Sequence, residues 1–480
     1  MFTQQNLLIS GGSFSLNTND THYHGLRRAF FSKYPLCETQ VFLKSVDGSD
    51  ILYRATATAA FHNSKERFDP PKCHPNTRLA VLTKIMKWIK WEGDLNAFII
   101  WVYGAAGAGK SAIAQTIAEM CEREMILLAS FFFSRNDPSR SNVNSLIATL
   151  AYQITLNLPD VREAIIGAIE HDPLIFSKSF AVQVETLIVA ALQPLVETGF
   201  FNDPTSRRLV IIDGLDECSD PKVQQNILQV LANSQQQHRL PLVFLFASRP
   251  EQHISLSFNT RLLSTITSRL ALDESYLPDE DIKLFLTDKF QEIKSTHRLR
   301  AYIPPEWPSS DVLEQLVRKS SGQFIYASTV IRYVSSVRHR PMDRLDIILG
   351  LRPPQRDLPF AELDALYTHI LAGVEDIERV LEILSVPLFC KNSYSLYKWN
   401  LRLTIIEKFL CLQPGDIELY LGELSSLVNL EPDRNIQVLH ASLTDFFVDP
   451  TRAKNFWINR QARHTAFARR CLQVLQIPGK

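Results

Sequence analysis

The chain has 480 residues, which is enough for about three domains that each bury their own core. Lysine and arginine total 51, and aspartate and glutamate also total 51, so no net charge attracts nucleic acid or an anionic membrane. Seven scattered cysteines without a C-x-x-C pair indicate free thiols rather than zinc ligands. With neither a signal peptide nor a long apolar run, the sequence predicts a cytoplasmic protein with no membrane segment and no nucleic-acid partner.

The first 60 residues predict a poorly defined N-terminal arm. Up to residue 24 the arm is rich in Gln, Asn, Ser, Thr and Gly, and Asp20 is its one charged residue. Pro70, Pro71 and Pro75 then precede a helical pattern in which apolar residues recur from Leu79 to Ile89. We therefore place the start of a new domain near residue 68 and assign 61–275 to it.

Short apolar runs alternate with helical stretches through this domain. The runs cover residues 97–103, 126–133, 209–212, 242–247 and 265–272. Near-continuous apolar runs between helices are typical of parallel strands that are buried on both faces. The sequence therefore predicts an α/β fold with a doubly wound parallel sheet.

After residue 275 the strand signals mostly stop. Acidic residues at 279–281 open a helical pattern, which predicts a helical domain over 276–352. Further helices and a short hairpin, with its turn near Asp433 to Asn435, predict a winged-helix domain over 353–460. Residues 461–480 are predicted to form a C-terminal helical tail.

The segment from Gly104 to Ser111 fits the P-loop pattern G-x-x-x-x-G-K-[ST] between a predicted strand and a predicted helix. Small residues let the backbone N–H groups curl around phosphates at a helix N-terminus, while Lys110 reaches the β and γ oxygens and Ser111 ligates Mg²⁺. The predicted nucleotide contacts here are Gly104, Gly107, Ala108, Gly109, Lys110, Ser111 and Ala112. The predicted ligands are ATP or ADP, with GTP as the alternative, and Mg²⁺.

The same glycines also satisfy a dinucleotide fingerprint, because Gly107, Gly109 and Ala112 fit G-x-G-x-x-G/A. That interpretation leaves Lys110 and Ser111 without a role. It also needs an acidic residue at the end of the second strand, where the sequence has Ser134 and Arg135. We reject it in favour of the P-loop.

Carboxylates follow the third predicted strand and an arginine follows the fourth. Asp213 is predicted to hold Mg²⁺ together with Ser111, Glu217 to polarise the attacking water, and Asp216 to support either role. Arg249 would lie beside the γ-phosphate if the two strands are neighbours. The alternative for Arg249 is a surface arginine before a proline turn.

Together, the P-loop, residues 213–217 and residues 248–250 resemble the NACHT branch of the STAND signalling NTPases. Residues 67–78 resemble the lead-in of fungal NACHT proteins, which suggests a fungal source and implies that Thr77 and Arg78 contact the nucleotide. The segment around His440 is similar to the Met-His-Asp segment of NB-ARC switches, which implies a contact with the β-phosphate of ADP. The sequence departs from the NB-ARC pattern at two places. Ala441 replaces the aspartate of the Met-His-Asp segment, and Gly322 to Phe324 stand where NB-ARC proteins have a proline that packs on adenine.

The resemblance implies a nucleotide-gated switch for signal transduction, as in innate-immune-like nonself recognition or regulated cell death. Such a switch is closed with ADP and forms a homo-oligomer with ATP, responds to a protein trigger, acts on a protein effector, and is reset by slow hydrolysis. Two other classes stay open: an AAA-type ATPase that does mechanical work, and a scaffold that binds nucleotide without turnover.

Overall fold

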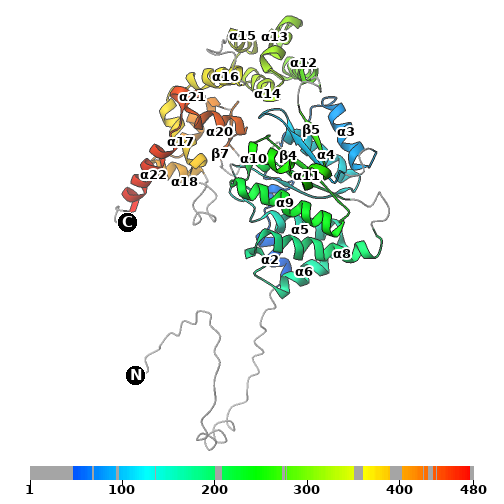
Figure 1. Cartoon of the computed structure of the whole chain (residues 1–480). Coiled ribbons are helices and arrows are strands. Elements are labelled where there is room, and N and C mark those ends of the chain that lie inside the picture. The colour runs from blue at the N-terminus through cyan, green and yellow to red at the C-terminus, as the bar shows by residue number, and fades with distance from the viewer. Residues whose placement is uncertain are drawn as a thin grey trace, which may run out of the picture. The chain divides into compact units, whose positions relative to one another are not determined.

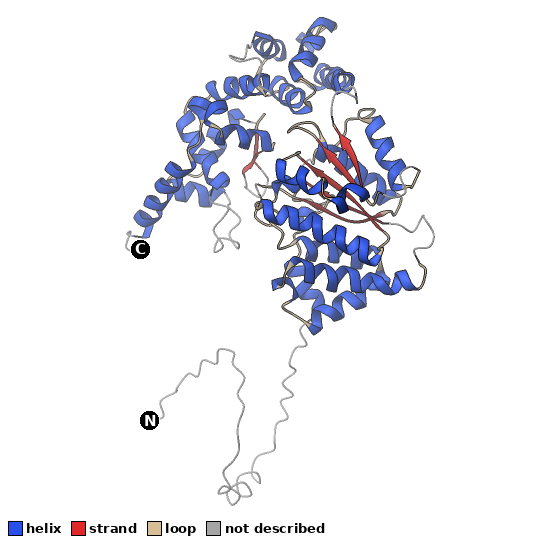
Figure 2. Cartoon of the chain, in the orientation of Figure 1, coloured by secondary structure: helices blue, strands red, loops and turns tan. Residues whose placement is uncertain are grey.

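The structure is a computed structural model of the chain. The described residues are 47–67, 70–92, 97–135, 137–200, 208–272, 276, 278–350, 360–389, 403–424, 426–430, 436–438 and 440–475. Within them, strands form one five-stranded sheet and one two-stranded sheet, and helices make up most of the remainder (Figure 2). Most of the predicted N-terminal arm, residues 1–46, lies outside the described residues.

The five-stranded sheet is parallel throughout and has the strand order β2-β3-β4-β1-β5. Its strands are β1 (Ile99–Tyr103), β2 (Leu127–Phe132), β3 (Arg208–Asp213), β4 (Leu242–Ser248) and β5 (Thr267–Ala271). Each strand falls at one of the five predicted apolar runs. The predicted α/β class with a doubly wound parallel sheet is confirmed.

Both faces of the sheet are buried, which explains why the strands are apolar at successive positions. In β1, Ile99 and Trp101 belong to one core cluster, whereas Ile100 and Val102 belong to another. Successive side chains of a strand point to opposite faces, so each apolar run supplies two cores at once.

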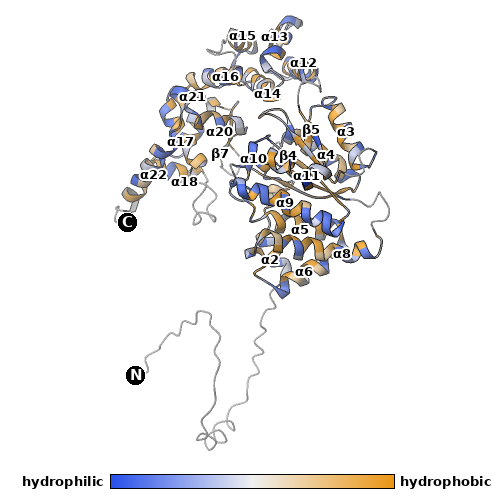
Figure 3. Ribbon diagram, in the orientation of Figure 1, coloured by the Kyte–Doolittle hydropathy of each residue, from blue (hydrophilic) through white to orange (hydrophobic). Residues whose placement is uncertain are grey.

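Helices cover both faces (Figure 1). The side of Ile100 and Val102 packs against α3 (Leu79–Ile89) and α4 (Lys110–Arg123). The opposite core includes residues from the helices α5 (Leu146–Asn157), α6 (Arg162–His171), α7 (Phe180–Val184), α8 (Ala190–Glu197), α9 (Pro221–His238), α10 (Gln252–Phe258) and α11 (Arg261–Ile266). Figure 3 colours α5 mostly apolar, whereas α9 has polar and apolar residues, as expected for a helix with one side in the core.

The folded domain begins earlier than the predicted boundary at residue 61. Helix α2 (Gly48–Ala55) packs against α5 and α6, and its Leu52 lies in the same core cluster as Trp101. Asp47 caps the helix by accepting a hydrogen bond from the backbone N–H of Ser49. The polar composition of the arm concealed this helix, since it buries only Gly48 and Leu52.

One stretch in the described part of the chain, Phe180–Glu197, has the length and mean hydropathy of a membrane-spanning helix. It contains a π-helical turn at Glu185–Val189, and 44% of it is buried inside the protein. Leu187 and Leu192 are fully buried in the core cluster shared with α5 and α6. A core helix accounts for this stretch.

Helices dominate the chain after β5. They are α12 (Pro278–Thr296), α13 (Ser310–Ser320), α14 (Phe324–Val334), α15 (Pro341–Gly350), α16 (Ala361–Ala372), α17 (Ile377–Phe389), α18 (Leu403–Leu410), α19 (Asp416–Leu421), α20 (Ala441–Val448), α21 (Pro450–Ala453) and α22 (Arg460–Leu475). Their buried side chains form one continuous cluster from Ile282 to Phe467, across the boundary predicted at residue 353. The predicted tail is also part of this body, because Phe467 of α22 packs against Phe409 and Arg470 pairs with Glu382.

The predicted hairpin is present. Strands β6 (Val428–Leu430) and β7 (Ile436–Val438) pair in antiparallel register after α18 and α19. The turn predicted near Asp433 lies outside the described residues. Helices followed by such a hairpin agree with a winged helix, which stays a prediction.

Candidate functional site

The loop between β1 and α4 has the geometry that a phosphate-binding loop requires. Gly107 and Gly109 have φ values of +80° and +93°, a backbone conformation that residues other than glycine rarely adopt. The loop ends at Gly109, and α4 starts at Lys110. The first N–H groups of that helix therefore face the loop without partners in the helix, where they can bind an anion.

Ile325 of α14 packs directly on this loop. A methyl group added to Gly107 would clash with Cγ2 of Ile325, whereas one added to Gly109 would meet no atom within 4 Å. The replacement Gly107→Ala is therefore expected to destabilise the protein by about 1–2 kcal/mol through its backbone conformation, and further through the clash. Gly109→Ala is the matched control, because it has the same conformational cost without the clash.

Thermal unfolding of the two variants without nucleotide checks this expectation. Gly107→Ala should have the lower midpoint. Equal midpoints would mean that Ile325 does not lie against the loop.

Lys110 lies folded over the loop. Its Nζ donates hydrogen bonds to the carbonyl oxygens of Gly104 and Ala105, both at 2.9 Å. Burial lowers the pKa of Lys110, and the carboxylate of Asp216 opposes that shift. The ammonium group is thus kept at the loop, where the β- and γ-phosphates of a bound nucleotide would lie.

Ser111 and Asp213 bring a hydroxyl and a carboxylate together, and their role at a metal ion stays a prediction. Asp213, at the end of β3, is only 4% exposed, and its carboxylate lies next to the Ser111 hydroxyl. Its Oδ1 atom has no hydrogen-bond partner among the described residues, and burial raises the pKa of Asp213 to about 6. These are hard oxygen ligands with one buried acceptor to spare, so the pair fits a Mg²⁺ ion that completes its shell with phosphate oxygens and water.

A tight turn after β3 presents Asp216 and Glu217. Gly214, at φ +71°, leads into a short 3₁₀ helix, Leu215–Glu217. Burial, and then the charge of Asp216, raise the pKa of Glu217 to about 7. A carboxylate with such a pKa can accept a proton from water near neutral pH, as a general base must.

Arg249 is held by carboxylates on two sides. Its backbone N–H donates to Oδ1 of Asp216 at 3.0 Å, and its Nε pairs with Oδ2 of the same residue at 3.2 Å. Its Nη1 pairs with Oδ2 of Asp445 on α20 at 2.7 Å. Burial alone would lower the pKa of Arg249, but Asp445 and Asp216 outweigh burial and raise it. Strands β3 and β4 are neighbours, which is the condition under which Arg249 was expected to lie beside a γ-phosphate; that contact stays a prediction.

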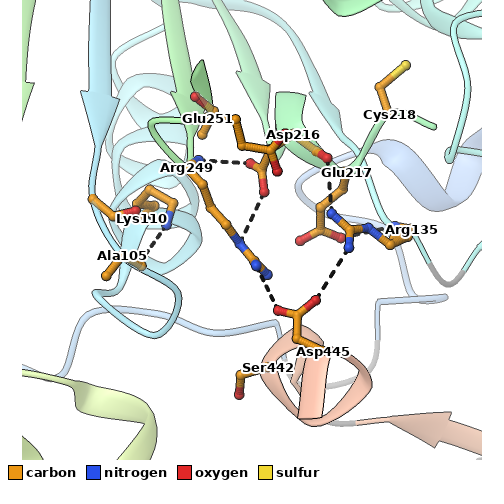
Figure 4. Close-up of polar contacts among 12 residues, drawn as sticks. Ala105, Lys110, Arg135, Asp216, Glu217, Cys218, Arg249, Glu251, Ser442 and Asp445 are labelled. Atoms are coloured by element: carbon orange, nitrogen blue, oxygen red, sulfur yellow. Dashed lines mark hydrogen bonds and ion pairs between the residues drawn. The ribbon is translucent and has the colours of Figure 1, made fainter. Parts of the chain in front are cut away.

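Asp445 and Arg135 belong to the site but were not among the predicted site residues. Arg135 pairs with Oδ1 of Asp445 at 3.3 Å and donates to the carbonyl oxygen of Asp216 at 3.2 Å, while its backbone N–H donates to Glu217 at 3.0 Å. Figure 4 shows both arginines converging on Asp445. The sequence could have indicated Arg135 as a site residue, because Arg135 follows the carboxyl end of a buried parallel strand, where ligands bind in such folds.

His440 caps α20. Its Nδ1 accepts a hydrogen bond from the backbone N–H of Ser442 at 3.1 Å and lies 2.8 Å from the Ser442 hydroxyl. Burial, and then the charges of Lys110 and Arg249, lower its pKa to about 4. The ring is therefore neutral at physiological pH with its proton on Nε2, which can donate a hydrogen bond to an anion.

Of the two predicted contacts Thr77 and Arg78, only Arg78 reaches the P-loop with its side chain. Nη2 of Arg78 donates to the carbonyl oxygen of Ala108 in the loop at 3.1 Å, and the guanidinium lies 5.0 Å from the ring centre of Phe324. The hydroxyl of Thr77 instead donates to the carbonyl oxygen of His74, so it supports the local turn. Arg78 thus contacts the P-loop at the predicted nucleotide site. Phe324, the last residue of the segment Gly322 to Phe324, lies against the Arg78 guanidinium.

One family model matches part of the chain. Residues 80–249 match the family model for the N-terminal region of nephrocystin 3. A search of curated proteins found no match. The matched region contains the P-loop, Asp213 and Arg249, whereas Arg78, His440 and Asp445 lie outside it.

Solved structures that match the chain include a Walker-type ATPase, a Cdc6p and an ORC complex. A Walker-type ATPase of Pyrococcus abyssi is 14% identical, with a TM-score of 0.38, over 78% of this chain and 97% of that chain. Cdc6p from Pyrobaculum aerophilum is 12% identical, with a TM-score of 0.35, over 78% and 93% of the two chains. A Drosophila ORC bound to GC-rich DNA and Cdc6 is 11% identical, with a TM-score of 0.28, over 88% and 75%. With TM-scores of 0.28 to 0.38, these structures say nothing about the function of this chain. The absence of a nucleic-acid partner stays a prediction.

Proposed function

We propose that the chain is a nucleotide-gated switch of the NACHT class, which binds ATP or ADP with Mg²⁺ at the P-loop and hydrolyses ATP slowly. One observation carries the proposal: Asp445 of α20 pairs with Arg249, and Arg249 pairs with Asp216 beside the P-loop. In this proposal, α20 stands at the position where a γ-phosphate would meet Arg249. ATP and α20 would compete for Arg249, whereas ADP would not.

The other residues have defined roles in this proposal. Lys110 and the loop amides bind the phosphates, and Ser111 with Asp213 would hold Mg²⁺, which supplies charge neutralisation at the phosphates. Glu217 orients and deprotonates the attacking water, and neutral His440 donates to the β-phosphate of ADP. The raised pKa of Glu217 supports hydrolysis over a scaffold without turnover.

Energetics require more than one contact for such a switch. Moving an equilibrium from 1:99 to 99:1 takes about 5.5 kcal/mol of differential binding. One hydrogen bond to a charged group contributes about 1.5–3 kcal/mol. Several contacts would therefore have to supply this free energy together. They are the ion pairs of Asp445 with its two arginines, the contact of His440, and packing between α20 and the site.

The resemblance to NACHT proteins favours signal transduction, in nonself recognition or regulated cell death. An unidentified protein would trigger opening, the open form would assemble as a homo-oligomer, and an unidentified effector would receive the signal. Turnover near or above about one per second, stimulated by a polymer, would instead favour an ATPase that does mechanical work.

The experiment that tests the switch is the variant Asp445→Asn in the full chain. Loss of the carboxylate charge leaves Arg249 free for a γ-phosphate, so we expect release of a fluorescent ADP analogue and exchange for ATP to become about tenfold faster. The control is Asp346→Asn, an exposed aspartate on α15. Stopped-flow release rates decide between the outcomes, and an unchanged rate in Asp445→Asn would refute gating by α20.

A further inference from the structure

Two arginines from different strands share one carboxylate. Arg249, which follows β4, pairs with Oδ2 of Asp445 at 2.7 Å, and Arg135, which follows β2, pairs with Oδ1 at 3.3 Å. Each guanidinium therefore binds a different oxygen of Asp445 (Figure 4). The arrangement is an anion site with two positively charged sides and a carboxylate as its occupant.

The two guanidinium groups are also anchored to a single residue. Asp216 binds Arg249 through its carboxylate and Arg135 through its carbonyl oxygen. The carboxyl ends of parallel strands meet at one edge of the sheet, and β3 separates β2 from β4 in the strand order. Both arginines consequently border the turn that carries Glu217, on the γ-phosphate side of the predicted nucleotide site.

Arg135 is the more exposed and the more loosely paired of the two arginines. Its side chain is 41% exposed, and its contact with Asp445 is the longer of the two pairs. Its backbone N–H is fixed to Glu217 at 3.0 Å, so the side chain can change partner without moving its main chain. Guanidinium groups bind phosphate oxygens as well as carboxylates, because both present two acceptors in the plane of the fork.

We propose that Arg135 is a second arginine for the terminal phosphate of a nucleoside triphosphate, masked by Asp445 while α20 is docked. The inference rests on the proposed function and deepens it. When α20 leaves, Asp445 leaves with it, and the γ-phosphate takes its place between Arg135 and Arg249. The pair of arginines therefore reads the difference between triphosphate and diphosphate, since ADP has no group at that position.

Equilibrium binding of ADP and of a non-hydrolysable ATP analogue to the full chain tests this role. The measurement is made in the Asp445→Asn background, because there the carboxylate no longer competes for the arginine. Adding Arg135→Ala is expected to weaken binding of the ATP analogue about tenfold and to leave ADP binding unchanged. Adding Arg135→Lys should restore part of the loss, because the charge remains but the planar fork does not. The control is Arg318→Ala, which removes an arginine that is 70% exposed on α13.

Two results would overturn the inference. Equal weakening of both nucleotides would mean that Arg135 only supports the fold of the site, and no weakening of either would mean that it does not reach the phosphate. Neither result contradicts the proposed function as long as ADP binding still depends on Lys110. Failure of the proposed function has a different signature: Lys110→Ala would then bind both nucleotides normally.

Discussion

Replacing Lys110 with alanine is expected to abolish nucleotide retention. The ammonium group, held over the loop by the carbonyl oxygens of Gly104 and Ala105, is the one positive charge that the P-loop itself offers to the β- and γ-phosphates. Charged hydrogen bonds contribute about 1.5–3 kcal/mol each, so losing the bonds to two phosphates should weaken binding by about 100-fold or more. Calorimetric titration with ADP, and chromatography of the nucleotide released from the purified protein, measure this effect.

The matched control for this experiment is Lys87→Ala. Lys87 is exposed on α3, so its removal changes the net charge by the same amount without touching the loop. The control should retain nucleotide. Undiminished ATP binding by Lys110→Ala would remove the basis for assigning the site.

Replacing Glu217 with glutamine is expected to stop hydrolysis and leave binding intact. Removing a general base typically costs about 10²–10⁴-fold in rate, and the amide is nearly the same size as the carboxyl group. ATP should then persist on the protein through a single-turnover experiment in which the unmodified chain converts it to ADP. Glu163→Gln, at an exposed position on α6, is the control and should turn over normally.

The same carboxyl group predicts the pH dependence of the unmodified chain. The pKa of Glu217 is raised to about 7, and a base works only in its ionised form. The hydrolysis rate should therefore rise with pH through about 7 and level off above it. An unchanged ATP lifetime in Glu217→Gln would identify the protein as a nucleotide-binding scaffold, and a flat pH profile would remove Glu217 from the role of base.

Local patterns in the sequence determined the core of the site. The P-loop is readable because its chemistry needs glycines, a lysine and a hydroxyl at fixed spacing within one turn of chain. Strands β1 to β4 were readable because burial on both faces favours apolar residues at most positions. Asp213 to Glu217 were readable because they follow such a strand directly. These signals depend only on neighbours along the chain, so they need no knowledge of the tertiary fold.

Only the tertiary structure revealed which distant residues complete the site. Asp445 is 310 residues from Arg135, and no periodicity or motif relates the two. The packing of Ile325 on Gly107, and of α2 on the helices beside the sheet, likewise depends on how separate segments meet. The sequence by itself predicted where phosphates and a metal ion would bind. The placement of α20 decided that a carboxylate lies between the two arginines, because that placement results from packing between segments far apart in the chain.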